Sequence, residues 1–227
     1  MIGLLSFDLD GTLADTGGEI AAAANATLRE FGLPPQPQRE IEALVGAGAE
    51  ALMLRLLARL DGRKCLDTGT VLERFAVHYD AHAGTSARPY PGCVEAVVRL
   101  RDAGVRLACV TNKPQRQARR VLETCALAAH FGILVGGDTL PFKKPDARVL
   151  RHVLAAYACP PDRAVHVGDS ETDLAAARNA GVAGWAVSWG YNGGVPIARA
   201  RPVCLFERFD AVAEAALRSS PPGLTAS

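Results

Sequence analysis

Apolar runs that end in small or polar residues recur along the chain and predict the strands of a buried sheet. Runs of this kind are typical of parallel strands that are covered on both faces. They lie at residues 2–8, 105–111, 133–138, 164–169, 184–190 and 203–206. Helical spacing of three and four residues appears between them, as at Val94, Val97, Val98 and Arg101 and at Val149, Leu150, Val153, Leu154 and Tyr157. Strand alternating with helix predicts a doubly wound α/β fold with a mostly parallel sheet.

A helical insert follows the first predicted strand. About ninety residues after that strand carry no strand pattern, and they contain stripes of apolar residues at helical spacing. The stripes are Ile20, Ala24, Leu28 and Phe31, then Leu52, Leu56 and Leu60, then Leu72, Phe75, Ala76 and Tyr79. We interpret them as the core of a helical cap at residues 16–84, inserted into a core domain of residues 1–15 and 85–218. Residues 219–227 are expected to form a disordered tail.

Length and charge exclude several classes of protein. With 227 residues, of which 49% are hydrophobic, the chain can form one large domain or one domain with a smaller insert. A formal net charge of +1 indicates neither a nucleic-acid-binding surface nor an acidic tail. The apolar stretch at residues 2–7 is short and lacks preceding basic residues, unlike a signal peptide or a membrane span. We therefore expect a cytoplasmic protein without nucleic-acid or membrane partners.

Cysteines and histidines do not form a recognisable metal site. The cysteines, Cys65, Cys93, Cys109, Cys125, Cys159 and Cys204, lack close pairs and are interpreted as reduced structural thiols. His78 and His82 lie four residues apart but lack a third ligand, so we interpret them as surface or packing residues. His166 lies within a predicted strand and is expected to be a hydrogen-bonded core residue.

Polar residues follow three of the predicted strands, at the sheet edge where ligands bind in open parallel sheets. They are Asp8 and Asp10, then Thr111, Asn112 and Lys113, then Asp169, Ser170 and Asp173, with Lys143 and Lys144 after the fragment GGDTLPF. Clustered carboxylates repel each other unless a cation lies between them, and oxygen ligands without His or Cys select Mg²⁺. We therefore expect Asp8 and Asp169 to bind Mg²⁺. Because Mg²⁺ is often bound together with substrate phosphates, the site predicts a phosphate-bearing ligand.

The spacing of the first two carboxylates suggests a task for each. A strand-end carboxylate that faces a bound phosphate can attack phosphorus, which makes Asp8 a candidate nucleophile. Side chains two residues apart in a strand point the same way, so Asp10 can act as general acid and base at the leaving oxygen. Gly11 allows a tight turn beside the phosphate, and Thr12 extends that turn.

Residues after the later strands would bind the phosphate. Thr111 would hold a phosphoryl oxygen. Pro114 suits the first position of a helix, whose N-terminal N–H groups would point at the anion. Lys144 would neutralise charge on Asp8 and on the transferring group.

The segments FDLDGTLADT, VTNKP, KKPDARVL and VGDSETD resemble, in order, the four motifs of the haloacid dehalogenase-like phosphatases. The resemblance implies a Rossmann-like core in which Asp8 is the nucleophile and Asp10 is the acid and base that also offers Mg²⁺ a backbone carbonyl. It also favours Lys144, which precedes proline, as the motif lysine and leaves Lys143 as a solvated neighbour. The other implied site residues are Gly11, Thr12, Thr111 and Asn112 at the phosphate, Asp169 at the metal, and Ser170 and Asp173 in support.

Further segments resemble the phosphoglycolate phosphatases of that family, over about residues 3–212. They are LVGAGAEALMLRLL, FGLP, PYPGC, GGDTLPFKKP and SWGYN. This resemblance implies that the cap closes over the site and reads the non-phosphate end of the substrate, with Gly46, Gly48 and Arg55 as candidates. Arg55 is equally well explained as a solvated helix residue. The chain departs from the usual pattern at KPDA (144–147), where Lys-Pro-x-Pro is common, and at RARPVCLF, which lacks an acidic residue after its proline.

The sequence therefore predicts a Mg²⁺-dependent phosphatase that hydrolyses a small phosphorylated metabolite, above all 2-phosphoglycolate, through an aspartyl phosphate. The alternatives are a phosphatase for a sugar phosphate or pyrophosphate, a sugar phosphomutase or a metal-free dehalogenase. An aspartyl-phosphate signalling or binding protein is the alternative from a different class, although a signalling receiver would be far shorter and lack the cap. We expect a monomer or a homodimer, and we interpret WGYNGG (189–194) as a turn.

Overall fold

A parallel sheet forms the centre of the protein, of which a computed structural model describes residues 2–60 and 66–218. The strand order is β5-β4-β1-β6-β7-β8, and every neighbouring pair is parallel. The strands are β1 (Leu4–Phe7), β4 (Arg106–Val110), β5 (Ile133–Val135), β6 (Ala164–Gly168), β7 (Ala183–Val187) and β8 (Cys204–Phe206). Each lies within a predicted run, except that β7 begins one residue earlier. The predicted doubly wound α/β fold is therefore confirmed.

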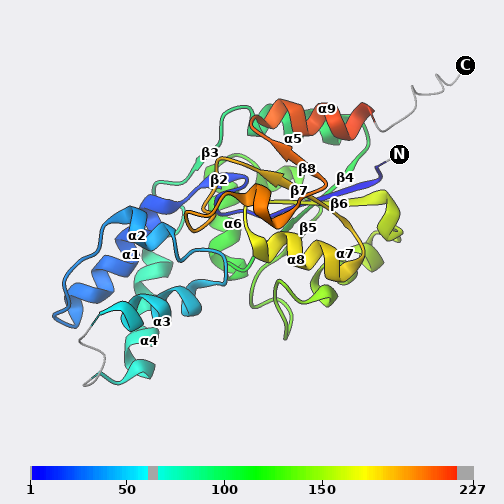
Figure 1. The fold of residues 1–227 in the computed structure, drawn as a ribbon. Coiled ribbons are helices and arrows are strands. Elements are labelled where there is room, and N and C mark those ends of the chain that lie inside the picture. Colours follow the sequence, from blue (N-terminus) through cyan, green and yellow to red (C-terminus); the bar gives the residue numbers. More distant parts are fainter. Residues whose placement is uncertain (1, 61–65, 219–227) are drawn as a thin grey trace, which may run out of the picture.

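Helices cover both faces of this sheet (Figure 1). The helices α5 (Cys93–Asp102), α6 (Gln115–Thr124) and α9 (Phe209–Arg218) pack on one face, and α7 (Ala147–Ala156) and α8 (Glu171–Ala180) on the other. Alternate residues of β1 reach the two layers, because Leu5 and Phe7 pack with the first group and Leu4 with the second. Short 3₁₀ helices, η2 (Ala128–His130), η3 (Pro161–Arg163) and η4 (Ile197–Ala200), lie in the connecting segments.

The helices that follow β1 group to one side of the sheet (Figure 1). They are α1 (Gly17–Glu30), α2 (Gln38–Glu42), α3 (Ala49–Arg59) and α4 (Thr68–His82). Their buried residues, among them Leu28, Met53 and Phe75, form a hydrophobic cluster drawn from these helices and the segments between them. The separate cluster supports a cap at residues 16–84, whose exact bounds stay a prediction. The predicted tail at 219–227 and Cys65 lie outside the described residues.

Polar contacts fix the end of α4 to the core helix α6. Asp80 accepts hydrogen bonds from the side chains of Arg116, Gln117 and Arg120. Four residues further on, the Gly84 carbonyl accepts a hydrogen bond of 3.0 Å from the Thr124 hydroxyl. The segment that returns the chain to the sheet is thus held at a defined position beside α6.

Several local predictions were wrong. The buried face of α4 includes Val71, whereas the predicted Ala76 is exposed. Pro114 precedes α6 instead of occupying its first position. A small antiparallel pair, β2 (Ala14–Asp15) with β3 (Arg88–Pro89), joins the two chain segments that connect sheet and cap. Strands of two residues are too short to show a periodic pattern, which explains why the sequence did not predict this pair.

The described cysteines are free thiols, and Cys93, Cys109, Cys125 and Cys159 are buried. His166 is buried as well, and its ring nitrogens lie 2.9 Å from the Ser6 hydroxyl and 3.3 Å from Asp173 Oδ1. The predictions of structural thiols and of a hydrogen-bonded core histidine agree with these positions. Within residues 2–60 and 66–218, no helix has the length and apolar character needed to cross a membrane.

Phe75 provides a test of the packing of the four helices. Its ring is 2% exposed and lies 5.4 Å from the ring of Tyr79, measured between centroids. We expect Phe75→Ala to lower the free energy of unfolding by about 3–5 kcal/mol because it leaves a cavity. The control, Val77→Ala in the same helix, removes a side chain that is 53% exposed and should change stability by less than about 0.5 kcal/mol. Equal urea midpoints for the two variants would contradict this packing.

Candidate active site

Three neighbouring strands bring the predicted residues together. Strand β1 lies between β4 and β6, and Phe7 is in register with Cys109 and Val167. The residues that follow these strands, Asp8, Thr111 and Asp169, therefore meet at one edge of the sheet.

The loop after β1 turns sharply around the Leu9 carbonyl. The N–H groups of Thr12, Leu13 and Ala14 all donate to this oxygen, at 3.0–3.2 Å. Gly11 has a φ of +82°, and a Cβ at this position would lie 2.3 Å from Asp169 Oδ2. Only glycine combines this backbone conformation with such a close approach. The predicted tight turn is present, and it brings the segment after β1 directly against the segment after β6.

An acidic cluster lies at this junction. Carboxylate oxygens of Asp8, Asp169 and Asp173 lie within 4.8 Å of one another, and all three residues are buried. The ammonium of Lys144 lies 2.8 Å from Asp8 Oδ1 and 2.6 Å from Asp173 Oδ1, and its own side chain is buried. Lys144 therefore neutralises part of the negative charge around Asp8, which is the arrangement that the sequence predicts for this lysine.

Burial and mutual repulsion shift the acids of the cluster in different directions. Burial raises the pKa of Asp8 to about 7, with Asp173 and Asp10 adding to the rise and Lys144 opposing it. Burial, followed by Asp173 and Asp8, raises the pKa of Asp169 well above its usual value. Burial alone would raise the pKa of Asp173 too, but Lys144 and His166 lower it below its usual value. A cation between Asp8 and Asp169 would favour their charged forms.

The donor set fits a hard divalent cation. The candidate ligand atoms are carboxylate oxygens, and Asp8 and Asp169 each offer one within 4.8 Å of the other. Such ligands suit Mg²⁺ better than zinc or copper. Asp173 already pairs with Lys144 and accepts a hydrogen bond of 2.6 Å from the Ser170 hydroxyl. These contacts are compatible with the supporting role expected for Ser170 and Asp173, which stays a prediction.

Asp169 is held by residues from two distant loops. Its Oδ1 accepts a hydrogen bond of 3.0 Å from the Thr12 hydroxyl, and its Oδ2 accepts one of 2.5 Å from the Tyr191 backbone N–H. Thr12 is buried and is not among the residues that line the pocket described below, and its predicted place at the phosphate stays a prediction. Trp189 donates to the Thr12 carbonyl at 3.2 Å. The fragment WGYNGG, interpreted from the sequence as a turn, thus supports the site.

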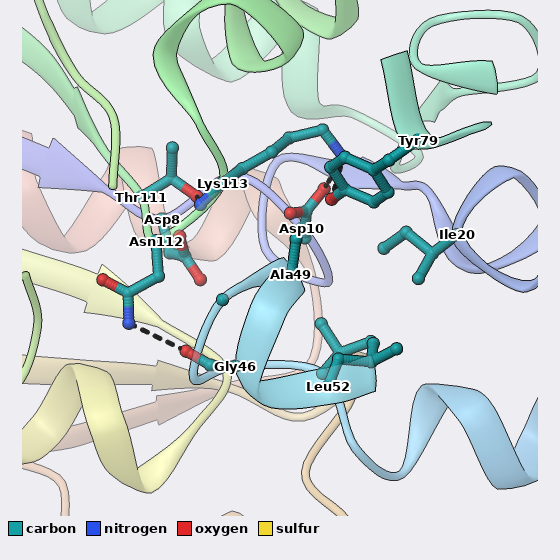
Figure 2. A pocket seen from close by; sticks show the side chains of 12 residues that line it. Asp8, Asp10, Ile20, Gly46, Ala49, Leu52, Tyr79, Thr111, Asn112 and Lys113 are labelled. Carbon is teal, nitrogen blue, oxygen red and sulfur yellow. Dashed lines mark hydrogen bonds and ion pairs between the residues drawn. The ribbon is translucent and has the colours of Figure 1, made fainter. Parts of the chain in front are cut away.

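A pocket separates the sheet edge from the cap helices (Figure 2). Its cavity volume is about 20 Å³, below the range of small-molecule sites, so the cap lies close over the sheet edge. The lining residues from the core are Asp8, Asp10, Thr111, Asn112 and Lys113, and those from the cap are Ile20, Val45, Gly46, Gly48, Ala49, Leu52 and Tyr79. Acids, a hydroxyl and an amide therefore face an apolar wall across a small space.

The cap contributes backbone and apolar groups to this pocket. Asn112 donates from Nδ2 to the Gly46 carbonyl at 2.9 Å, a hydrogen bond drawn in Figure 2, and to the Lys144 carbonyl at 3.0 Å. Gly46 and Gly48 both line the pocket, and their role in reading the substrate stays a prediction. Arg55 is exposed and is not among the residues that line the pocket, although Leu52 of the same helix lines it. This position agrees with a solvated helix residue, and a role of Arg55 in reading the substrate stays a prediction.

Lys113 is a feature of the site to which the sequence assigned no role. Its side chain is fully buried, and its Nζ lies 3.1 Å from Asp10 Oδ1 and 2.9 Å from the Tyr79 hydroxyl. Figure 2 shows the side chain extending from the end of β4 to Asp10 and Tyr79. In the sequence, only its position directly after Thr111 and Asn112 pointed to the site. Its contact with Tyr79 could not be predicted, because Tyr79 lies far away along the chain.

Comparisons with known proteins find relatives along nearly the whole chain. A family model described as haloacid dehalogenase-like hydrolase matches residues 5–187. The chain is 39% identical over 208 residues to phosphoglycolate phosphatase 1 of Pseudomonas aeruginosa, covering 90% of this chain and 76% of that protein. It is 37% identical over 213 residues to a phosphoglycolate phosphatase of Agrobacterium fabrum, with 93% and 91% covered. A crystal structure of a predicted phosphoglycolate phosphatase from Haemophilus somnus has a TM-score of 0.90 at 29% identity, covering 94% and 97%.

Gly190 tests the close packing behind the acidic cluster. A Cβ at this position would lie 2.3 Å from the Asp169 Cβ and 2.4 Å from the Gly11 carbonyl oxygen. Because both neighbours are held in place, we expect Gly190→Ala to lower stability by about 1–3 kcal/mol and to displace Asp169. The control is Gly18→Ala in α1, where the nearest atom would lie 3.7 Å from the new Cβ and no loss is expected. Unchanged thermal unfolding of both variants would contradict the close packing of Gly190 against Asp169 and Gly11.

Proposed function

The chain belongs to the haloacid dehalogenase-like hydrolases, and we propose that this phosphatase hydrolyses 2-phosphoglycolate to glycolate and phosphate, using Mg²⁺ and an aspartyl-phosphate intermediate. The observation that carries the proposal is the placement of Asp8. This carboxylate follows the central strand, pairs with Lys144 at 2.8 Å and lines the pocket together with Asp10.

In the proposed reaction a carboxylate oxygen of Asp8 attacks phosphorus, and the bond from phosphorus to the glycolate oxygen breaks. Asp10 gives its proton to the departing oxygen. A water then attacks the phosphorus of the aspartyl phosphate, Asp10 accepts a proton from that water, and phosphate leaves with Asp8 restored. The carboxyl group of Asp10 is thus the acid when the aspartyl phosphate forms and the base when it is hydrolysed.

Other residues would bind and neutralise the phosphoryl group. Thr111 lines the pocket at the end of β4 and offers its hydroxyl to a phosphoryl oxygen. Lys144 offsets the negative charge that gathers on Asp8 and on the transferring oxygens. Asp8 and Asp169, with the backbone carbonyl of Asp10, would hold Mg²⁺. The metal, when bound, would supply positive charge to phosphoryl oxygens.

Three features support a small substrate. The pocket is small, with a cavity volume of about 20 Å³, and this favours a compact metabolite over a large one. Its cap side offers backbone groups at Gly46 and Gly48 together with apolar side chains. The relatives named phosphoglycolate phosphatase align with 90% or more of this chain, cap included. Together these features favour 2-phosphoglycolate over larger sugar phosphates.

Phosphate release from a panel of phosphomonoesters tests this proposal. With Mg²⁺ present, kcat/KM for 2-phosphoglycolate should exceed that for sugar phosphates by at least about tenfold, because the closed pocket selects by size and charge. Removal of divalent cations with a chelator should abolish release, and Asp8→Asn should give no release above the blank while keeping its thermal unfolding profile.

The outcomes separate the parts of the proposal. A flat profile across the panel would overturn 2-phosphoglycolate as the preferred substrate while leaving a phosphatase. Full activity after removal of divalent cations would exclude the metal. Turnover by Asp8→Asn at the wild-type rate would remove Asp8 as the nucleophile.

A further inference from the structure

The ammonium of Lys113 joins the catalytic segment to the cap. It lies 3.1 Å from Asp10 Oδ1 in the core, 2.9 Å from the Tyr79 hydroxyl of α4 and 3.5 Å from Glu19 Oε1 of α1. It also lies 4.7 Å from the centroid of the Tyr79 ring. A lysine ammonium has three N–H donors, and three oxygen atoms surround this one. Lys113 therefore donates hydrogen bonds to Asp10 and Tyr79 and forms an ion pair with Glu19, whose Oε1 accepts no hydrogen bond among the described residues.

The surroundings of Lys113 are buried and charged. The side chains of Lys113 and Glu19 are 0% and 1% exposed. Glu19 is further held by the Gly84 N–H, which donates to its Oε2 at 2.9 Å. Burial opposes the charge of Lys113, but Asp10, Tyr79 and Glu19 raise the pKa of Lys113 above its usual value. The lysine thus stays charged between two carboxylates that would otherwise face each other without a cation.

Both contacts that orient Asp10 fall on the same oxygen. Asp10 Oδ1 accepts a hydrogen bond of 2.7 Å from the Thr16 hydroxyl and lies 3.1 Å from Lys113 Nζ. Within the part of the chain that the structure describes, no hydrogen-bond donor is paired with Oδ2. Because Thr16 and Lys113 both hold Oδ1, Oδ2 is the oxygen that can exchange a proton with a bound substrate or water.

We infer that Lys113 is a positioning residue, which holds Oδ1 of Asp10 so that Oδ2 faces the leaving oxygen, and which ties this orientation to the cap through Glu19 and Tyr79. The inference rests on the proposed function, in which Asp10 transfers the proton. It assigns no contact between Lys113 and the substrate.

A double-mutant cycle tests whether Lys113 acts through Asp10. We would measure kcat/KM for 2-phosphoglycolate with Mg²⁺ in the wild type, Lys113→Met, Asp10→Asn and the double variant. Lys113→Met should lower kcat/KM by about 100-fold, the size of a general-acid contribution. In the Asp10→Asn background the same change should cost less than about threefold, because the carboxyl group on which it acts is gone.

The leaving group provides a second readout that a purely structural role would not change. 4-Nitrophenyl phosphate releases a stable anion that needs little help from an acid. Lys113→Met should therefore lower kcat/KM for this ester by less than about tenfold, in contrast to its effect on 2-phosphoglycolate. An equal loss for both esters, or an undiminished effect in the Asp10→Asn background, would overturn the inference.

Controls separate this inference from the proposed function and from misfolding. No phosphate release by the wild type, or full activity of Asp10→Asn, would refute the proposed function itself. Thermal unfolding checks the fold of each variant. Lys113→Met removes the cation beside the buried Glu19 carboxylate and could therefore prevent folding. In that case the double variant Glu19→Gln, Lys113→Met is compared with Glu19→Gln alone, because neither variant leaves this carboxylate unpaired. The same selective loss with 2-phosphoglycolate is then expected, and an equal loss for both esters again refutes the inference.

Discussion

The ion pairs of Lys144 with Asp8 and Asp173 are the interaction on which the rest of the site depends. Buried carboxylates this close repel one another, and each loses the water that would stabilise its charge. The Lys144 ammonium lies 2.8 Å from Asp8 and 2.6 Å from Asp173, and its positive charge offsets part of this repulsion. It also lowers the pKa of Asp173 below its usual value. The remaining negative charge is what a divalent cation would offset. The close turn at Gly11 and the Tyr191 backbone N–H hold Asp169 next to this pair.

A second ammonium divides the carboxylates into two environments. Asp8 pairs with Lys144 from the loop before α7, whereas Asp10 pairs with Lys113 from the end of β4. Neighbouring acids with different partners can take different roles in one reaction, and the proposed nucleophile and acid fit this pattern. The two lysines also differ in what they connect. Lys144 links core residues, but Lys113 reaches α1 and α4. The position of the cap and the orientation of the proposed acid are therefore parts of one network.

Much of this arrangement could be predicted because it follows from local pattern. Apolar runs located every strand of the central sheet, and the rule that ligands bind beyond strand ends was enough to group Asp8, Thr111 and Asp169. Contacts between distant segments could not be predicted in this way. Nothing near Tyr191 in the sequence indicates that its N–H holds Asp169, and Arg55 shares a helix with Leu52 but faces solvent. Helical periodicity alone could not decide which of several possible faces α4 would bury.

The most direct test of the central claim is to trap the covalent intermediate. Wild-type enzyme mixed with 2-phosphoglycolate and Mg²⁺ is quenched in acid during turnover and analysed by mass spectrometry of its peptides. The account predicts a mass increase of one phosphoryl group on the peptide that contains Asp8, which disappears on treatment with hydroxylamine and is absent from Asp8→Asn. Phosphate release with no phosphorylated Asp8 at any quench time, or a phosphoryl group found on another residue, would contradict it.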